Sequence, residues 1–155
     1  MTTLKINDPA PAFEAKDQEG NVISSKTLSG KKYALYFYPK DNTPACTVQA
    51  CNLRDNYSEL EKNGISIIGV SMDSEVSHQK FMNKHQLPFP LISDTEKKLL
   101  ETFNVWGPKK FMGREYDGIH RTTFAVDEKG IIKGIILKPK TKDHAAEILE
   151  IFKNN

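Results

Sequence analysis

The sequence predicts an α/β domain in which helices flank a central mixed β-sheet. Two continuous apolar runs, YALYFYP and ISIIGVS, are each followed by a segment of helical periodicity, which is the pattern of parallel strands joined by helical crossovers. Near the C-terminus, two strand-like segments flank a turn that contains Gly and lead into a last helix, which adds an antiparallel hairpin to the sheet. The length suits a single domain over residues 1–155.

The first half of the chain supplies the parallel strands. Its N-terminal stretch reads as extended segments and turns. Residues 33–39 are predicted to be a buried strand and residues 44–62 the helix after it, because Thr-Pro begins a helix well and Asn63-Gly64 ends one. Residues 65–71 are predicted to be the second buried strand. The connection between the first strand and its helix therefore lies beyond the carboxyl end of a strand, where ligands bind in such sheets.

The middle of the chain continues the alternation of helices and strands. A helix over residues 75–86 is predicted to begin at the cap candidates Asp73 and Ser74, and a short strand follows at Leu91-Ile92. Ser93 and Glu96 have the spacing of a capping box, which predicts that another helix begins there.

The C-terminal part completes the sheet. Residues 105–120 are rich in Gly, Lys and aromatic residues and are predicted to be a loop. Residues 122–137 are predicted to form a hairpin that turns at residues 128–130, and residues 144–152 the last helix. Of the four histidines, His78, His85 and His144 fall on predicted helices and are expected to be solvated, as is the pair Lys109-Lys110.

Composition and charge exclude several classes of function. Lys and Arg number 22 against 20 acidic residues, and the net charge of +2 is scattered, so no nucleic-acid partner is expected. No apolar run approaches about 18 residues, and the N-terminus lacks the apolar core of a signal peptide. We therefore expect a cytoplasmic protein without a membrane span. In such a protein two cysteines are expected to be free or reactive thiols.

Cys46 occupies the place where a helix stabilises an anion. Thr43 suits the N-cap and Pro44 the first helical position, so Cys46 falls in the first turn. Backbone N–H groups and the helix dipole favour negative charge there, which predicts a nucleophilic thiolate. The alternative is that Cys46 and Cys51 are ordinary buried cysteines. A zinc site is disfavoured because two cysteines without paired histidines leave the ligand set short.

The two cysteines point in different directions from one helix. A buried stripe is predicted by spacings of 4, 3, 4 and 3 along Cys46, Ala50, Leu53, Tyr57 and Leu60. Cys51 points about 140° away from Cys46, and the two Cα atoms of a helical pair at this spacing are about 8–9 Å apart. A disulfide needs a Cα separation within about 7 Å. The pair can therefore bond only if the first turns of the helix unwind.

At these residues the chain resembles the peroxiredoxins, in particular the bacterioferritin comigratory protein (Q-type) subfamily. The resemblance covers nearly the whole chain and includes DPAPAFEAKDQEG, YFYPKDNTPACTVQACNLRD and FNVWGPKKFMGREYDGIHRTTFAVDEKG. The family pattern Pro-x-x-x-Thr-x-x-Cys is met by Pro39, Thr43 and Cys46. Two positions depart from the usual subfamily pattern: Ala45 stands where Gly is frequent, and Gln49 stands where Glu is frequent.

The resemblance implies a thioredoxin-like fold and a thiol-dependent peroxidase for hydrogen peroxide and organic hydroperoxides. Cys46 would attack the peroxide and become a sulfenic acid. Cys51 would resolve it as an intramolecular disulfide, and a thioredoxin-type donor would reduce that disulfide. No metal or organic cofactor is implied, and members with both thiols in one helix are often monomers, so we expect a monomer.

The resemblance also implies the other site residues. With Cys46 and Cys51, the catalytic set would contain Thr43, whose hydroxyl can reach the thiolate, and Arg121, whose guanidinium would stabilise the thiolate and hold the peroxide oxygens. The substrate-binding set would be Pro39, Thr43, Pro44, Ala45 and Arg121. A further group of residues, expected either to rim the pocket, to dock the donor or only to pack the loop, is Trp106, Phe111, Met112 and Tyr116.

Two other functions compete with a peroxidase. A disulfide oxidoreductase or isomerase of the same fold is disfavoured because the chain has no CxxC motif. A redox sensor or holdase, in which the disulfide switch is the output, remains open. Oxidation of Cys46 without turnover by a reducing system would favour the sensor.

Overall fold

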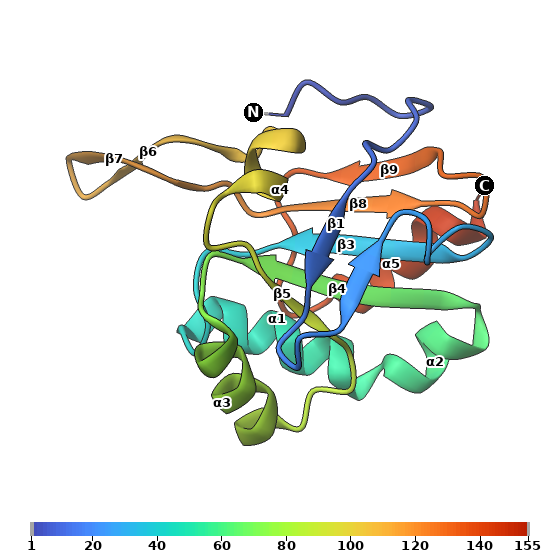
Figure 1. Cartoon of the computed structure of the whole chain (residues 1–155), viewed down its shortest axis with the longest axis horizontal. Helices are drawn as coiled ribbons and strands as arrows, with labels where there is room; N and C mark the ends of the chain where they lie inside the picture. The colour runs from blue at the N-terminus through green and yellow to red at the C-terminus, as the bar shows by residue number, and fades with distance from the viewer. Residues whose placement is uncertain (1, 155) are drawn as a thin grey trace.

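A five-stranded mixed sheet forms the centre of the protein, as seen in a computed structural model that describes residues 2–154 (Figure 1). Its strands, in spatial order, are β5 (Leu91–Ser93), β4 (Ile65–Ser71), β3 (Lys32–Phe37), β8 (Thr122–Val126) and β9 (Ile132–Ile136). β3, β4 and β5 run parallel, whereas β8 is antiparallel to both β3 and β9. The predicted mixed sheet is therefore confirmed.

Both faces of the sheet are covered. The helices are α1 (Pro44–Asp55), α2 (Tyr57–Lys62), α3 (Glu75–His85), α4 (Lys98–Thr102) and α5 (His144–Lys153). One face packs against α1, α2, α3 and α5 through a cluster that includes Leu53, Leu60, Phe81 and Ile148. The other face packs against α4 and the N-terminal segments, with Phe103 against Phe37 and Phe124. Burial on both faces explains the continuous apolar runs of β3 and β4.

The predicted helix over residues 44–62 is two helices. Asn56 separates α1 from α2 with φ −109° and ψ 13°. Its side-chain Nδ2 donates to the carbonyl of Asn52 at 2.8 Å, and its backbone N–H donates to the same carbonyl at 3.2 Å. A short amide side chain that competes in this way for a backbone acceptor disturbs helical geometry. The prediction of one continuous helix was wrong at this residue.

The predicted loop over residues 105–120 is a hairpin. β6 (Trp106–Phe111) pairs antiparallel with β7 (Arg114–Ile119) and projects beyond the body of the molecule (Figure 1). Its two turn residues, Met112 and Gly113, have φ of 52° and 80°, which suits the two-residue turn that matches strand twist. A second small sheet pairs β1 (Glu14–Lys16) with β2 (Val22–Ser24).

Of the two helix starts predicted from capping residues in the middle of the chain, one is confirmed and one is wrong. The Oγ of Ser74 accepts from the N–H of Ser77 at 3.1 Å, so Ser74 caps α3 as predicted. Ser93 ends β5 instead of capping a helix, and α4 begins only at Lys98. The carboxylate of Asp94 accepts from the backbone N–H of Leu100 at 2.9 Å and takes over the role predicted for a capping box. None of the helices within residues 2–154 has the length and apolar character to cross a membrane.

Candidate active site

Cys46 lies in the first turn of α1, at the carboxyl end of β3. It is only 2% exposed and belongs to the buried stripe that continues along the helix through Ala50 and Leu53. Pro44 is the first residue of α1, and the N-cap residue Thr43 has an extended backbone, as the sequence indicated. The early N–H groups of a helix have no intrahelical acceptor, so this turn presents donors to an anion beside Cys46.

The hydroxyl of Thr43 does not bond to Cys46. It donates to the carbonyl of Lys40 at 2.9 Å, and it makes no cap hydrogen bond to α1. The backbone carbonyl of Thr43 accepts from the N–H of Thr47 at 2.8 Å and thereby begins the helix. The expected contact between this hydroxyl and the sulfur of Cys46 is therefore absent. The Thr43 side chain instead stabilises the loop that precedes α1.

Arg121 reaches Cys46 from the start of β8, the strand next to β3 in the sheet. It immediately precedes β8, and its Nη2 donates to the Sγ of Cys46 at 3.2 Å. Its Nη1 donates to the Oε1 of Gln49 at 2.5 Å. The guanidinium is therefore held by two side chains one helical turn apart, and its charge lies directly against the thiol. The structure thus brings together Cys46 and Arg121, residues 75 positions apart in the chain.

Gln49 is a site residue whose role the sequence left open. It is fully buried, it orients Arg121, and its Nε2 has no hydrogen-bond partner among the described residues. Its spacing of three residues from Cys46 places it on the same side of the helix, which is the signal that identifies it. A neutral amide here holds the guanidinium without adding a negative charge beside the thiol.

Tyr36 is a second buried neighbour that the sequence analysis did not select. Its ring stacks on Tyr38 with centroids 5.3 Å apart, and its hydroxyl is buried without a partner in the part of the chain that the structure describes. Burial raises the pKa of Tyr36 well above its usual range, and the charge of a Cys46 thiolate raises it further. The phenol therefore stays protonated, and Cys46 is among the groups whose charge acts on it.

The remaining predicted substrate residues lie around the first turn. Pro39 is half-buried, whereas Pro44 and Ala45 are exposed. Cys46 is therefore covered mainly by the helix–sheet packing and by Arg121, and the two exposed residues form the outer side of the turn.

Cys51 is half-buried and lies on another face of α1. Both cysteines are free thiols, and α1 is continuous through both of them. The Sγ of Cys51 is 3.8 Å from the Nδ1 of His85 at the end of α3. The helix is therefore intact at both cysteines, as the sequence predicted. At a helical spacing of five residues the two thiols cannot form a disulfide unless the helix opens.

The loop before α1 is tied to α3 by a buried polar network. Asp41 accepts from the Tyr38 hydroxyl at 2.5 Å and from the Ser77 hydroxyl at 2.9 Å, and its Oδ2 is 2.7 Å from the Nδ1 of His78. The Nε2 of His78 is 3.0 Å from the carbonyl of Ile92. His78 is therefore fully buried between two acceptors, and the expectation that it would be solvated was wrong.

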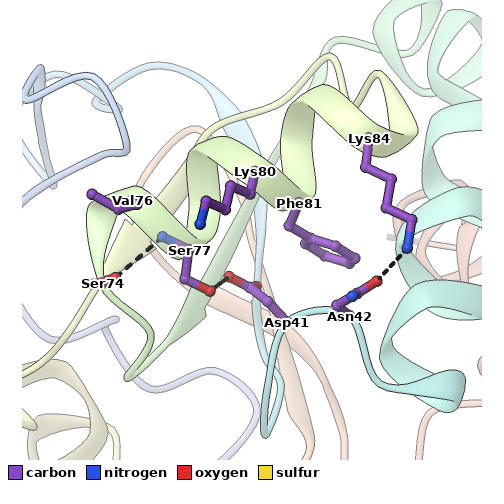
Figure 2. Close-up of a pocket in the computed structure, with 8 residues that line it drawn as sticks. All are labelled: Asp41, Asn42, Ser74, Val76, Ser77, Lys80, Phe81 and Lys84. Carbon is purple, nitrogen blue, oxygen red and sulfur yellow. Dashed lines mark hydrogen bonds between the residues drawn. The ribbon is translucent and has the colours of Figure 1, made fainter.

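Figure 2 shows this connection from the side of α3. The Ser77 hydroxyl points at Asp41, and the Nζ of Lys84 reaches the Oδ1 of Asn42 at 3.2 Å. The pocket drawn there holds about 350 Å³ and does not include Cys46. The carboxylates of Asp41 and Asp73 and the imidazole of His78 approach within 4.8 Å of one another, as ligands of a metal ion would, but hydrogen bonds to protein groups already occupy them.

His144 and Lys109 also depart from the expectation of solvation. His144 is fully buried, with Nε2 2.8 Å from the Thr123 hydroxyl and Nδ1 2.9 Å from a carboxylate oxygen of Glu147. Burial lowers the pKa of His144, and Glu147 opposes that shift. Lys109 is half-buried and donates to the carbonyl of Ile119 at 2.9 Å, and burial together with the charge of Arg121 lowers the pKa of its ammonium group.

The four residues for which rim, docking and packing roles were considered lie on the β6–β7 hairpin. Phe111, Met112 and Tyr116 lie at the projecting hairpin and are 65%, 88% and 48% exposed. Trp106 is half-buried at the base of the hairpin, where the ammonium of Lys97 lies 4.8 Å from the centre of its ring. Trp106 is therefore packed against its surroundings, whereas the side chains of the other three residues are open to solvent.

The mixed sheet flanked by helices is a thioredoxin-like fold. A buried cysteine in the first turn of a helix, in contact with an arginine, is a thiol placed to act as a nucleophile. Fold and site together indicate a thiol-dependent oxidoreductase. Comparison of the sequence with known protein families identifies the family within this class. Residues 6–135 match the AhpC/TSA family, and the chain belongs to this family of peroxiredoxins. It is therefore a thiol-dependent peroxidase with an antioxidant role.

Individual relatives agree with this assignment. The chain is 45% identical over 152 residues to Peroxiredoxin Bcp of Bacillus subtilis, covering 98% of this chain and 97% of the relative. It is 43% identical over 155 residues to Peroxiredoxin Bcp of Escherichia coli, covering 100% and 99%. Among solved structures, Peroxiredoxin Q of Xanthomonas campestris superposes with a TM-score of 0.88 at 32% identity, covering 99% of this chain and 98% of the other. The resemblance read from the sequence is thus confirmed.

Proposed function

We propose that this peroxiredoxin reduces hydrogen peroxide and organic hydroperoxides with electrons from a thioredoxin-type donor. The observation that carries the proposal is the 3.2 Å contact from the Arg121 guanidinium to the Cys46 sulfur in the first turn of α1. A related structure is titled for the alkyl peroxide reduction activity of the Xanthomonas campestris bacterioferritin comigratory protein, which supports organic hydroperoxides as substrates here.

The first chemical step takes place at Cys46. Its thiolate attacks one peroxide oxygen, the O–O bond breaks, and the other oxygen leaves as water or an alcohol after taking up a proton. Cys46 is left as a sulfenic acid. Arg121 and the first-turn N–H groups provide fixed donors for the charge that moves onto the leaving oxygen. Pro39, Thr43, Pro44 and Ala45 shape the turn at which the peroxide binds.

The second step joins the two thiols. Cys51 attacks the sulfenic sulfur of Cys46, and water leaves as an intramolecular disulfide forms. Because α1 is continuous through both residues, its first turns open before the sulfurs meet. A thioredoxin-type dithiol then reduces the disulfide, and α1 closes again. In this proposal the whole chain acts as one domain, a monomer in the cytoplasm.

Two variants test the assignment. Peroxide consumption in the presence of thioredoxin, thioredoxin reductase and NADPH should be abolished in Cys46→Ser. Cys51→Ser should react once with peroxide but fail to recycle. Mass spectrometry of the wild type after one equivalent of peroxide should show the loss of two hydrogens. Normal recycling in Cys51→Ser would contradict the role of Cys51, and stoichiometric oxidation of the wild type without turnover would support a redox sensor instead.

A further inference from the structure

The resolving thiol has an unassigned neighbour. The Nδ1 of His85 is 3.8 Å from the Sγ of Cys51, and this ring comes from α3, a different element from the helix that carries both cysteines. The ring packs edge-on against Phe81, with centroids 5.3 Å apart. Sulfur contacts at this distance are compatible with a thiol that donates to an imidazole nitrogen. His85 is thus positioned by packing to face Cys51.

The surroundings of His85 favour its neutral form. Its Nε2 is buried without a hydrogen-bond partner among residues 2–154, and an unpaired buried N–H costs more on a charged ring than on a neutral ring that carries its proton on Nε2. Burial lowers the pKa of His85, and the positive charges of Lys84 on the same helix and Arg54 on α1 lower it further. Asp55 pairs with Arg54 at 2.9 Å but faces that guanidinium, not the ring. At neutral pH His85 therefore has a lone pair for a proton.

The contact can persist while Cys46 moves. Arg54 donates through Nη1 to the backbone carbonyl of His85 at 2.8 Å, which fixes the later part of α1 to α3. On the other side, the Nδ2 of Asn52 donates to the carbonyl of Lys142, and its Oδ1 accepts from the N–H of Ala145 at 2.8 Å. These anchors follow Cys51 directly, whereas Cys46 lies before them. Opening from the start of α1 therefore brings Cys46 toward a Cys51 that stays beside His85.

We propose that His85 is the general base for the resolving step, a role that rests on the proposed function of Cys51. His85 takes the proton from the Cys51 thiol as that sulfur attacks the sulfenic sulfur of Cys46. The S–S bond forms, the S–O bond of the sulfenic acid breaks, and the leaving hydroxide takes up a proton to become water. The imidazolium then returns its proton to solvent, so that a thiol and a sulfenic acid give a disulfide and water without another oxidant or reductant.

The expected effect is large at neutral pH. Without a base, a thiol reacts only through the fraction that is already thiolate. General bases typically accelerate proton-transfer steps by about 10²–10⁴. We expect His85→Gln to form the disulfide at least about tenfold more slowly at pH 7, while sulfenic acid still forms at the wild-type rate.

The experiment follows both steps in one turnover. Reduced protein is mixed with one equivalent of hydrogen peroxide and quenched at intervals with dimedone and a thiol-alkylating reagent, and mass spectrometry counts sulfenic acid and disulfide. In the wild type, the rate of disulfide formation should rise as His85 loses its proton and then level off by neutral pH. In His85→Gln the rate should climb without levelling, because only thiolate formation controls it.

A second pair of variants keeps the His85 imidazole and changes only the charges near it. Lys84→Gln removes an exposed charge that lowers the pKa of His85, so the rise in the pH profile should move to higher pH. Lys80→Gln removes the same charge one turn earlier on α3 and should leave the profile where it is. Equal rates and profiles in His85→Gln and wild type would overturn the proposal, as would an unmoved profile in Lys84→Gln. If the proposed function itself fails, the wild type forms neither sulfenic acid nor disulfide.

Discussion

Replacing Arg121 with Gln should slow the reaction of Cys46 with peroxide. The substitution removes a charged donor 3.2 Å from the sulfur and leaves the Oε1 of the buried Gln49 without its partner. A hydrogen bond to a charged group contributes about 1.5–3 kcal/mol. Since each 1.36 kcal/mol corresponds to a factor of ten in rate, the expected loss is about 10- to 150-fold.

The measurement is the second-order rate of Cys46 oxidation under single-turnover conditions, with Arg114→Gln as the matched control. Arg114 is an exposed arginine on β7, so its replacement makes the same chemical change away from the thiol. Arg121→Lys should recover only part of the rate, because one ammonium does not reproduce the fork that holds both Cys46 and Gln49. If Arg121→Gln oxidises as fast as Arg114→Gln, the arginine contact does not contribute to catalysis.

Three further predictions concern stability, measured by urea unfolding. His78→Leu removes the imidazole contact of the buried Asp41 carboxylate and should cost about 1–3 kcal/mol, and an unchanged midpoint would show that this contact does not contribute to stability. Gly134→Ala places a Cβ about 2.5 Å from the Cδ1 of Ile151 and should cost about 1–3 kcal/mol through overpacking. Burial lowers the pKa of His144, so below about pH 6.5 the unfolded chain binds more protons than the folded one, and stability should fall as the pH is lowered from there toward the folded pKa. His144→Asn should show a smaller decrease over the same range, and an identical decrease would assign it to other groups.

The sequence predicted most of the sheet and the position of Cys46 in the first turn of α1. Continuous apolar runs and a Thr-Pro helix start are local signals, and they correctly placed β3, β4 and Cys46. The proximity of Arg121 followed only from the family resemblance, because the two residues meet through sheet pairing across 75 positions. No local pattern encodes such a contact.

Each wrong prediction has a physical cause. Asn56 divides the predicted helix because its side-chain amide donates to a backbone carbonyl. The β6–β7 hairpin was predicted to be a loop because its strands contain Lys and Gly and its turn, Met112-Gly113, is short. His78 and His144 were expected at the surface because their positions on helices carry no sign of their partners. Asp41, which contacts His78, and Thr123, which contacts His144, both come from distant segments of the chain.

The buried ring of His78 provides an internal spectroscopic reporter. A backbone carbonyl accepts but never donates, so the Nε2 facing Ile92 carries a proton, and full burial shields that proton from solvent. Its exchange with water should be slow enough for a distinct imidazole signal in nuclear magnetic resonance spectra, since exchange requires local opening. The other nitrogen contacts Asp41, two residues before Thr43, so its chemical shift senses the loop that precedes α1. Adding peroxide to an isotopically labelled sample would then test whether the opening proposed for α1 spreads into that loop or stops at Thr43.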